Sequence, residues 1–135
     1  MASVLRVPVD TEIDVVTARL RGNEFAEKLG FSSSEVYAIA IAVSEVARNI
    51  VRYARRGRIT FSEIHSSGRT GISVVAEDDG PGIPDLNRAM EPGFSTGNSL
   101  GLGLNSAERQ MDEFEIVSTL GDGTTVAMTK WRRRK

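Results

Sequence analysis

Residues 77–84 read Glu-Asp-Asp-Gly-Pro-Gly-Ile-Pro, and they are the most informative stretch of the chain for its fold. It ends an apolar run, and acidic residues followed by Gly-Pro-Gly at the end of a strand form a tight turn with exposed backbone N–H groups. Asp78 is therefore placed to accept a hydrogen bond from an amino group such as that of adenine. The alternative is a plain turn with capping acids, which two glycines and two prolines within residues 80–84 make less favourable.

The pattern on both sides of this turn predicts strands and helices. Val4 to Val9 alternates as a strand does, and Ser32 to Glu35 is a possible capping box at the start of a helix. The expected order is a strand at 4–9, a helix from 10 or 11 to 30, a helix from 32 to 54, strands at 58–64 and 72–77, a loop at 79–101 with one short helical possibility at 85–90, a helix at 104–111, and strands at 114–119 and 124–131. Strands covered by helices on one face predict an α+β two-layer sandwich, with a mixed, mostly antiparallel sheet and three helices on one face.

Length and composition favour a single domain over residues 1–135, with an ordinary globular balance of 40% hydrophobic and 26% charged residues. The net charge of −1 argues against a nucleic-acid partner, and the basic tail at 132–135 is interpreted as a solvated end. The chain has no cysteine, which excludes disulfides, thiolate metal sites and cysteine nucleophiles. No apolar run approaches the ~20 residues of a membrane span, so we expect no membrane partner and a cytoplasmic location.

A second polar group lies on the helix expected from 32 to 54. Glu45 and Asn49 are four residues apart and share one face of that helix, whose N-terminal part is apolar almost all round. A carboxylate beside an amide oxygen can serve a magnesium ion directly or through its waters, because magnesium prefers hard oxygen ligands. The alternatives are a polar pair on the helix surface, or an ion pair between Glu45 and either Arg48 or Arg52.

The third feature is the glycine-rich segment at 93–104, which reads Gly-Phe-Ser-Thr-Gly-Asn-Ser-Leu-Gly-Leu-Gly-Leu and opens a helix. Glycines let backbone N–H groups approach phosphates, and a helix N-terminus adds positive potential. Ser95, Thr96 and Ser99 can supply hydroxyls, and a flexible loop is the alternative. The segment is not a Walker A loop, since no G-x-x-x-x-G-K-[ST] occurs, and the H-R-D and D-F-G motifs of eukaryotic-type kinases are missing.

Taken in order, these motifs resemble those of the GHKL ATPase/kinase superfamily, which has the Bergerat ATP-binding fold. The order is Glu-x-x-x-Asn on a helix, Asp-x-Gly-x-Gly after a strand, Gly-x-Gly before a helix, and Gly-x-Gly-Thr before the last strand. Each motif is weak by itself, and the ordered set is specific. The stretches at 44–50, 77–84, 93–96 and 111–114 narrow the resemblance to the small bacterial anti-sigma-factor serine kinases, and among them to the stressosome switch kinases.

The resemblance implies ATP and Mg²⁺ as cofactors and a role for each matching residue. Glu45 is then the catalytic base and contacts the metal through water, Asn49 is the Mg²⁺ ligand, and Asp78 binds the adenine amino group. The nucleotide-binding residues that it implies are Asn49, Asp78, Gly80, Gly82, Ile83, Ser95, Thr96, Gly101, Leu102, Gly103, Leu104 and Thr124.

The resemblance also implies partners. A serine or threonine of a STAS-domain scaffold or antagonist protein is the expected phosphoacceptor, and release of the kinase is expected to activate a downstream phosphatase. The first alternative is an anti-sigma factor that binds and inhibits an RNA polymerase sigma subunit. The second is a detached histidine-kinase ATPase domain.

Overall fold

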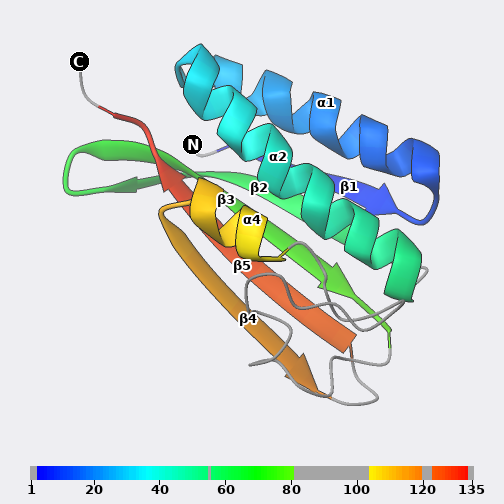
Figure 1. Ribbon diagram of the computed structural model, residues 1–135. Coiled ribbons are helices and arrows are strands. Elements are labelled where there is room, and N and C mark those ends of the chain that lie inside the picture. Colours follow the sequence, from blue (N-terminus) through cyan, green and yellow to red (C-terminus); the bar gives the residue numbers. More distant parts are fainter. Residues whose placement is uncertain (1–2, 55, 81–103, 120–122, 134–135) are drawn as a thin grey trace.

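The computed structural model describes residues 3–54, 56–80, 104–119 and 123–133. In chain order the elements are β1 (Val4–Val9), α1 (Glu12–Lys28), α2 (Ser33–Asn49), the π-helix η1 (Ile50–Ala54), β2 (Gly57–Ser66), β3 (Arg69–Asp78), α4 (Leu104–Gln110), β4 (Glu113–Thr119) and β5 (Gly123–Trp131). This order confirms the expected one for the described residues (Figure 1). The second helix, expected to run to about Ala54, does reach Ala54, and its last turn is a π-helix. The short helix expected at 85–90 lies outside the described residues.

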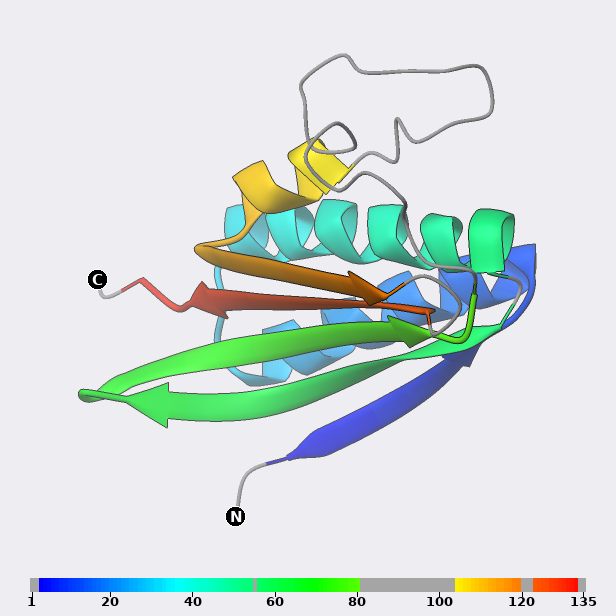
Figure 2. The ribbon, with the colours of Figure 1, turned by 90° about the horizontal axis from the view of Figure 1, so that it is seen from below.

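The five strands form one sheet in the order β1-β2-β3-β5-β4. We expected a mixed, mostly antiparallel sheet, and all four pairings between the described strands are antiparallel. The three helices α1, α2 and α4 cover one face of this sheet, as Figures 1 and 2 show, which confirms the α+β two-layer sandwich. Because consecutive side chains of a strand point to opposite faces, every second residue of each strand faces the helices.

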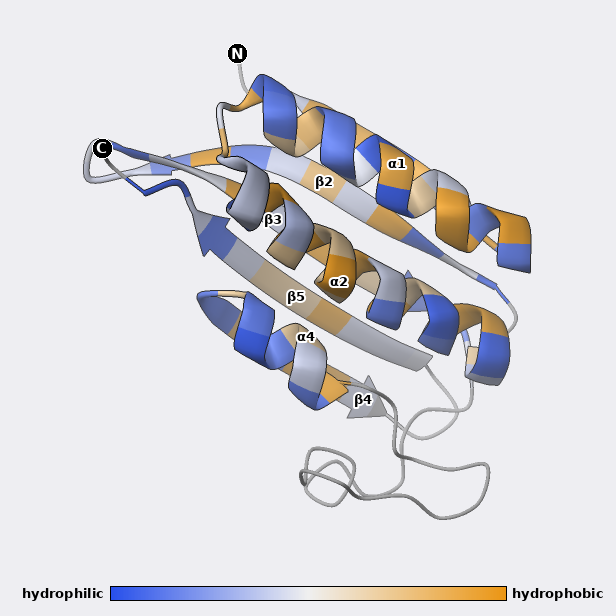
Figure 3. Cartoon of the chain, turned by 45° about the horizontal axis from the view of Figure 1, so that its top comes forward, coloured by the Kyte–Doolittle hydropathy of each residue, from blue (hydrophilic) through white to orange (hydrophobic). Residues whose placement is uncertain are grey.

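The core lies between the sheet and α2, which packs between α1 and α4. Phe61, Ile72, Val74 and Met128 from the sheet are at most 1% exposed and meet Ile39 and Val43 of α2 in this layer. Figure 3 shows that the middle of α2 is hydrophobic, whereas its C-terminal part carries hydrophilic residues. At this end Val46 and Ala47 still pack in the core, while Glu45, Arg48 and Asn49 are less buried, so one face of the last turns is polar.

Residues that follow β5 bond to the end of α1 and to the start of α2. The expected capping box is confirmed, because the Glu35 N–H donates to Ser32 Oγ at 3.2 Å and the Ser32 N–H donates to Glu35 Oε1 at 2.8 Å. The other oxygen of the Glu35 carboxylate accepts the Arg133 N–H at 3.0 Å. Arg132 donates to Leu29 O at 2.6 Å, at the end of α1. The tail was interpreted as a solvated end, and its two described arginines, although exposed, take part in these bonds.

None of the described helices is long and apolar enough to cross a membrane.

Candidate active site

One transverse row of residues crosses the sheet where β3 ends. Gly57 of β2 is opposite Asp78 of β3, and Ser118 of β4 is opposite Thr124 of β5. The pairing of Glu77 with Thr125 in β3 and β5 sets Asp78 beside Thr124. Asp78 lies two residues after the buried Ala76, and Thr124 two residues before the buried Val126, so both side chains lie on the helix-covered face. Four strands therefore bring this row together beneath the C-terminal end of α2.

Asp78 is the centre of the row. Its Oδ1 accepts two backbone N–H groups, from Gly80 at 2.9 Å and from Thr124 at 3.2 Å. Burial raises the pKa of the Asp78 carboxyl above its ordinary value, and the two N–H donors only partly offset that effect. Because both donors reach the same oxygen, Oδ2 is left, as far as the described residues go, to accept a hydrogen bond from a ligand. A half-buried carboxylate with one free oxygen suits an exocyclic amino group.

Two glycines let neighbouring segments close on Asp78. A Cβ at Gly80 would lie 2.6 Å from Ala54 Cβ, so the turn after β3 packs directly against η1. Gly123 has φ +99°, which side-chain-bearing residues rarely adopt, and a Cβ there would overlap the Asp78 carbonyl oxygen and lie 3.3 Å from Asp79 Cα. Glycine at these positions allows the hairpin, the turn and the helix end to meet at one carboxylate.

Glu45 and Asn49 lie at the other side of the site, on the last turns of α2. Arg48 Nη1 donates to Glu45 Oε1 at 2.9 Å, so the ion pair that the sequence left open is formed with Arg48. The side chains of Glu45 and Arg48 are 27% and 45% exposed, which leaves both open to an incoming molecule. Asn49 Nδ2 is buried and has no partner among the described residues. A buried amide N–H without an acceptor costs about 1–3 kcal/mol, so a bound group that satisfies it is favoured here.

The oxygen ligands of Glu45 and Asn49 would be enough for magnesium only together with phosphate oxygens of a nucleotide. No cluster of three or more His, Cys, Asp or Glu side chains that would hold a metal occurs among the described residues. An amide oxygen from Asn49 and a carboxylate from Glu45 are hard ligands of the kind that magnesium accepts while it keeps several waters and binds phosphate oxygens. These two residues therefore suit a metal that arrives with its nucleotide.

The remaining residues expected at the site divide into two groups. Leu104 begins α4 and is 2% exposed, so it packs in the core beneath the site. Gly82, Ile83, Ser95, Thr96, Gly101, Leu102 and Gly103 lie outside the described residues. Sequence reasoning missed Ser118 and Ala54, because neither belongs to a motif. The register of β4 against β5 brings Ser118 opposite Thr124, and the π-helix η1 brings Ala54 against Gly80.

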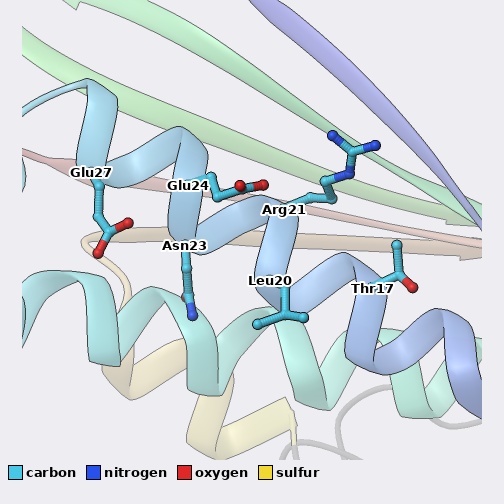
Figure 4. Close-up of a pocket in the computed structure, with 6 residues that line it drawn as sticks. All are labelled: Thr17, Leu20, Arg21, Asn23, Glu24 and Glu27. Atoms are coloured by element: carbon cyan, nitrogen blue, oxygen red, sulfur yellow. The ribbon is translucent and has the colours of Figure 1, made fainter.

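A shallow pocket of about 460 Å³ lies away from this site, on the outer side of α1 (Figure 4). Its lining is Thr17, Leu20, Arg21, Asn23, Glu24 and Glu27, and none of these belongs to the transverse row. The pocket is a surface feature of one helix and does not extend the site around Asp78.

Comparison with known proteins identifies the family. The sequence model of the histidine kinase-like ATPase domain family matches residues 7–130 of this chain. The chain belongs to the histidine kinase-like ATPase domain family. A solved structure of the RsbU and RsbW domains of a Mycobacterium tuberculosis protein superposes with a TM-score of 0.63, covering 98% of this chain and 33% of that one. At 21% identity, this likeness supports the fold alone, and the chain spans about a third of that solved chain.

Curated relatives in this ATPase family narrow the class of protein. The serine/threonine-protein kinase RsbT of Bacillus subtilis is 45% identical over 94% of this chain and 96% of its own length. An anti-sigma F factor of a Thermoanaerobacter species is 36% identical over 79% of this chain and 78% of its own. With this degree of identity to a kinase along nearly the whole chain, the protein is an ATP-using enzyme of the protein-serine/threonine kinase class.

Proposed function

We propose that this protein uses Mg-ATP to phosphorylate a serine or threonine of a STAS-domain partner in a bacterial stress-response partner-switching (stressosome) pathway. On release from that partner it activates a downstream phosphatase. The observation that carries the proposal is the half-buried Asp78 carboxylate: its Oδ1 is held by two backbone N–H groups, and no described residue donates to Oδ2, which leaves that oxygen for the adenine amino group. The 45% identity to RsbT along nearly the whole chain supports the choice among ATP-using functions.

Each side of the site has a separate task in this proposal. Asp78 and Thr124 hold the base at the end of the sheet, and Asn49 binds the magnesium ion that accompanies the phosphates. When bound, the metal would neutralise the charge that develops on the phosphoryl group during its transfer. Glu45 lies one turn before Asn49 on α2, next to the residue that would hold the metal.

Glu45 is the proposed general base. It takes the proton of the acceptor hydroxyl, directly or through one water, as the hydroxyl oxygen bonds to the γ-phosphorus. The bond between that phosphorus and the oxygen bridging it to the β-phosphate breaks, and ADP leaves. In the structure Glu45 Oε1 is bonded to Arg48, so Arg48 holds the carboxylate at the solvent-facing side of α2, the side from which an acceptor protein has access.

The test is transfer of radiolabelled phosphate from ATP and magnesium to purified STAS-domain proteins. Wild-type protein is expected to leave a stable serine or threonine phosphate on one of them. Glu45→Gln keeps the shape of the side chain and is expected to bind ATP with unchanged affinity by calorimetry while transfer stops. Normal transfer by Glu45→Gln would remove Glu45 as the base, and failure of the wild-type protein to bind ATP would overturn the proposal as a whole.

A second candidate function is that of an anti-sigma factor, favoured by the 36% identity to anti-sigma F factors. Both functions use one nucleotide pocket, so the pocket does not separate them. Pull-down of purified RNA polymerase sigma subunits in the presence of ATP does. Tight, ATP-dependent capture of a sigma subunit without phosphorylation of any STAS protein would favour the anti-sigma function over the kinase pathway proposed above.

A further inference from the structure

Another pocket, of about 630 Å³, lies where β5 ends, and four cations gather in it. The cations are Arg69, Lys130, Arg132 and Arg133, and they surround the ring of Trp131 together with the carboxylates of Asp112 and Glu113. β5 begins beside Asp78, so at about 3.3 Å per residue the strand from Thr124 to Trp131 puts roughly 23 Å between this pocket and the nucleotide site (Figure 1). The pocket is therefore a separate feature of the molecule.

The two carboxylates of this pocket each accept a hydrogen bond from an uncharged donor. Asp112 Oδ2 accepts the backbone N–H of Trp131 at 2.7 Å, and Glu113 Oε2 accepts the indole N–H of the same residue at 2.8 Å. Arg48 and Arg58 pair with nearby carboxylates elsewhere, but the described residues form no ion pair with the four cations of the pocket. The pocket thus concentrates positive charge that its own acids do not neutralise by contact.

Lys130 is the most enclosed of these cations. It is 9% exposed, and its Nζ donates at 2.8 Å to the carbonyl oxygen of Gln110, at the end of α4. An ammonium carries three N–H donors, and this bond is the only one that the described residues offer to Nζ. The charges of Glu35 and Lys130 interact, but the carboxylate oxygens of Glu35 accept the N–H groups of Ser32 and Arg133. Because burial of an ammonium without a contacting anion is costly, an anion that reaches Nζ would be stabilised here.

The three guanidinium groups are placed so that each keeps free donors. Arg69 stacks on Trp131, with Cζ 4.4 Å from the centre of the ring, and this contact restricts its orientation. Arg132 donates from Nη1 to Leu29 O, while the exposed side chain of Arg133 bonds to no described residue. Since a guanidinium carries five N–H donors, all three can still donate to a ligand.

The charge of the lining indicates which anion fits. Four positive and two negative side chains give the lining a net formal charge of +2. A phosphate monoester carries about −1.5 to −2 at pH 7 and offers three strong acceptor oxygens, whereas a carboxylate carries one charge and two oxygens. Guanidinium groups also match phosphate oxygens with two parallel N–H bonds. The pocket therefore complements a phosphate group better than it complements a carboxylate.

We propose that this pocket is a phosphate-binding site, in which Lys130, Arg69 and Arg133 hold a phosphate dianion beside Trp131. The dianion is free phosphate or the phosphorylated side chain of a partner protein, since both present the same oxygens and charge. The site is separate from the Asp78 pocket and can be filled while a nucleotide is bound. The inference does not depend on the kinase pathway proposed above.

The experiment uses a reporter that the chain already contains. Trp131 is the only tryptophan in the sequence and lines the pocket, so its fluorescence responds to a ligand there. The whole protein is titrated with inorganic phosphate, with a peptide that carries one phosphoserine and with the unphosphorylated peptide, at constant ionic strength, by fluorescence and by calorimetry. Saturable binding is expected for phosphate, and none is expected for the unphosphorylated peptide.

The two phosphate-bearing probes distinguish the source of the ligand. Binding of the phosphopeptide at least about tenfold tighter than that of phosphate would identify a phosphorylated protein as the ligand, because contacts beyond the phosphate then contribute. Equal or weaker binding of the phosphopeptide would identify free phosphate. No saturable binding of either probe would overturn the site, and so would phosphate binding that ATP displaces, because the phosphate would then lie in the nucleotide pocket.

Variants test the residues, with calorimetry as the measurement. Arg69→Gln and Arg133→Gln change exposed side chains and are each expected to weaken phosphate binding about five- to tenfold, the effect of one charged hydrogen bond near the surface. Lys130→Met keeps the length of the side chain and is expected to abolish detectable phosphate binding, with unchanged ATP affinity as the check that the fold persists. Arg21→Gln, which removes the same charge from an exposed position on α1, is the matched control and is expected to stay within about twofold of wild type. Losses in Arg21→Gln equal to those in the pocket variants would show a general charge effect and overturn the proposal.

Discussion

Gly123→Ala is the substitution for which the structure makes the sharpest prediction. Gly123 begins β5 at φ +99°, and a Cβ there would overlap the Asp78 carbonyl oxygen and lie 3.0 Å from its carbon. The neighbour in this clash is backbone, so it cannot be relieved by rotation of a side chain. The hairpin end and the turn after β3 must instead move apart, which disturbs the bond between the Thr124 N–H and Asp78 Oδ1.

The expected magnitude has two parts. A residue with a Cβ in the left-handed region costs roughly 1–2 kcal/mol, and backbone shifts forced by an added methyl group cost typically about 1–3 kcal/mol. Gly123→Ala is therefore expected to lower the free energy of unfolding by about 2–5 kcal/mol. Nucleotide affinity is expected to fall at least about tenfold, since a charge-assisted hydrogen bond contributes about 1.5–3 kcal/mol and Asp78 loses its fixed position.

Gly30→Ala is the matched control. Gly30 also has a left-handed backbone, φ +89°, but the nearest atom to a Cβ there is Arg132 Nη1 at 2.9 Å, at the far end of a flexible side chain. Its expected cost is the backbone part, about 1–2 kcal/mol, together with displacement of the exposed hydrogen bond from Arg132 Nη1 to Leu29 O. ATP affinity is expected to stay unchanged, because Gly30 follows α1 at the other end of the molecule.

The assay is urea denaturation of both variants and of the wild type, followed by calorimetric titration with ATP. The difference between the two variants isolates the clash with Asp78. If Gly123→Ala loses no more stability than Gly30→Ala and binds ATP as the wild type does, the close approach of the hairpin to Asp78 has no energetic importance and does not hold the site together.

Three further predictions concern titratable and charged groups. Burial raises the pKa of Asp78, so ATP affinity is expected to fall as the pH drops through that raised pKa, while the stability of the ligand-free protein rises. Asp78→Asn is expected to abolish ATP binding and to remove the pH dependence of stability. Calorimetry measures the affinity and thermal melting measures the stability, each at several pH values. Burial opposes ionisation of Glu35, but the hydrogen bonds from the N–H groups of Ser32 and Arg133 outweigh burial and lower the pKa of Glu35. The ionised carboxylate therefore stabilises the fold above the ordinary pKa range of a glutamate, and this stabilisation is lost as the pH falls through the lowered pKa. Glu35→Gln is expected to cost about 1–3 kcal/mol at pH 7 in urea denaturation and to weaken this pH dependence of stability. Arg48→Ala is expected to leave ATP affinity within about twofold and to change phosphotransfer, since it frees the carboxylate of Glu45; unchanged transfer rates across pH 6–9 would count against any influence of the ion pair on the base.

Local sequence patterns were enough to predict the helices, the strands and the class of site. Strand alternation, the capping box from Ser32 to Glu35 and the acid-Gly-Pro-Gly turn are local patterns, and each is set by residues within a few positions of one another. Glu45 and Asn49 could be placed on one helix face by spacing alone. The sequence left Arg48 and Arg52 as candidate partners of Glu45, and the structure forms the ion pair with Arg48, three residues along the helix.

How these patterns combine depends on contacts between residues that are distant in the chain. The bond between Thr124 and Asp78 joins residues 46 positions apart, and Ser118 reaches them through the register of a third strand. Strand order and register depend on how all faces of the sheet bury their apolar side chains together, which no local pattern specifies. The helix reaches Ala54, as expected, through a π-turn that the local pattern does not indicate, and the close approach of Gly80 to Ala54 packs the Asp78 turn against this helix end. Single motifs indicated the chemistry of the site. The positions of the Asp78 carboxylate, of the Thr124 N–H and of the Asn49 amide depend on the packing of segments that are distant in the chain.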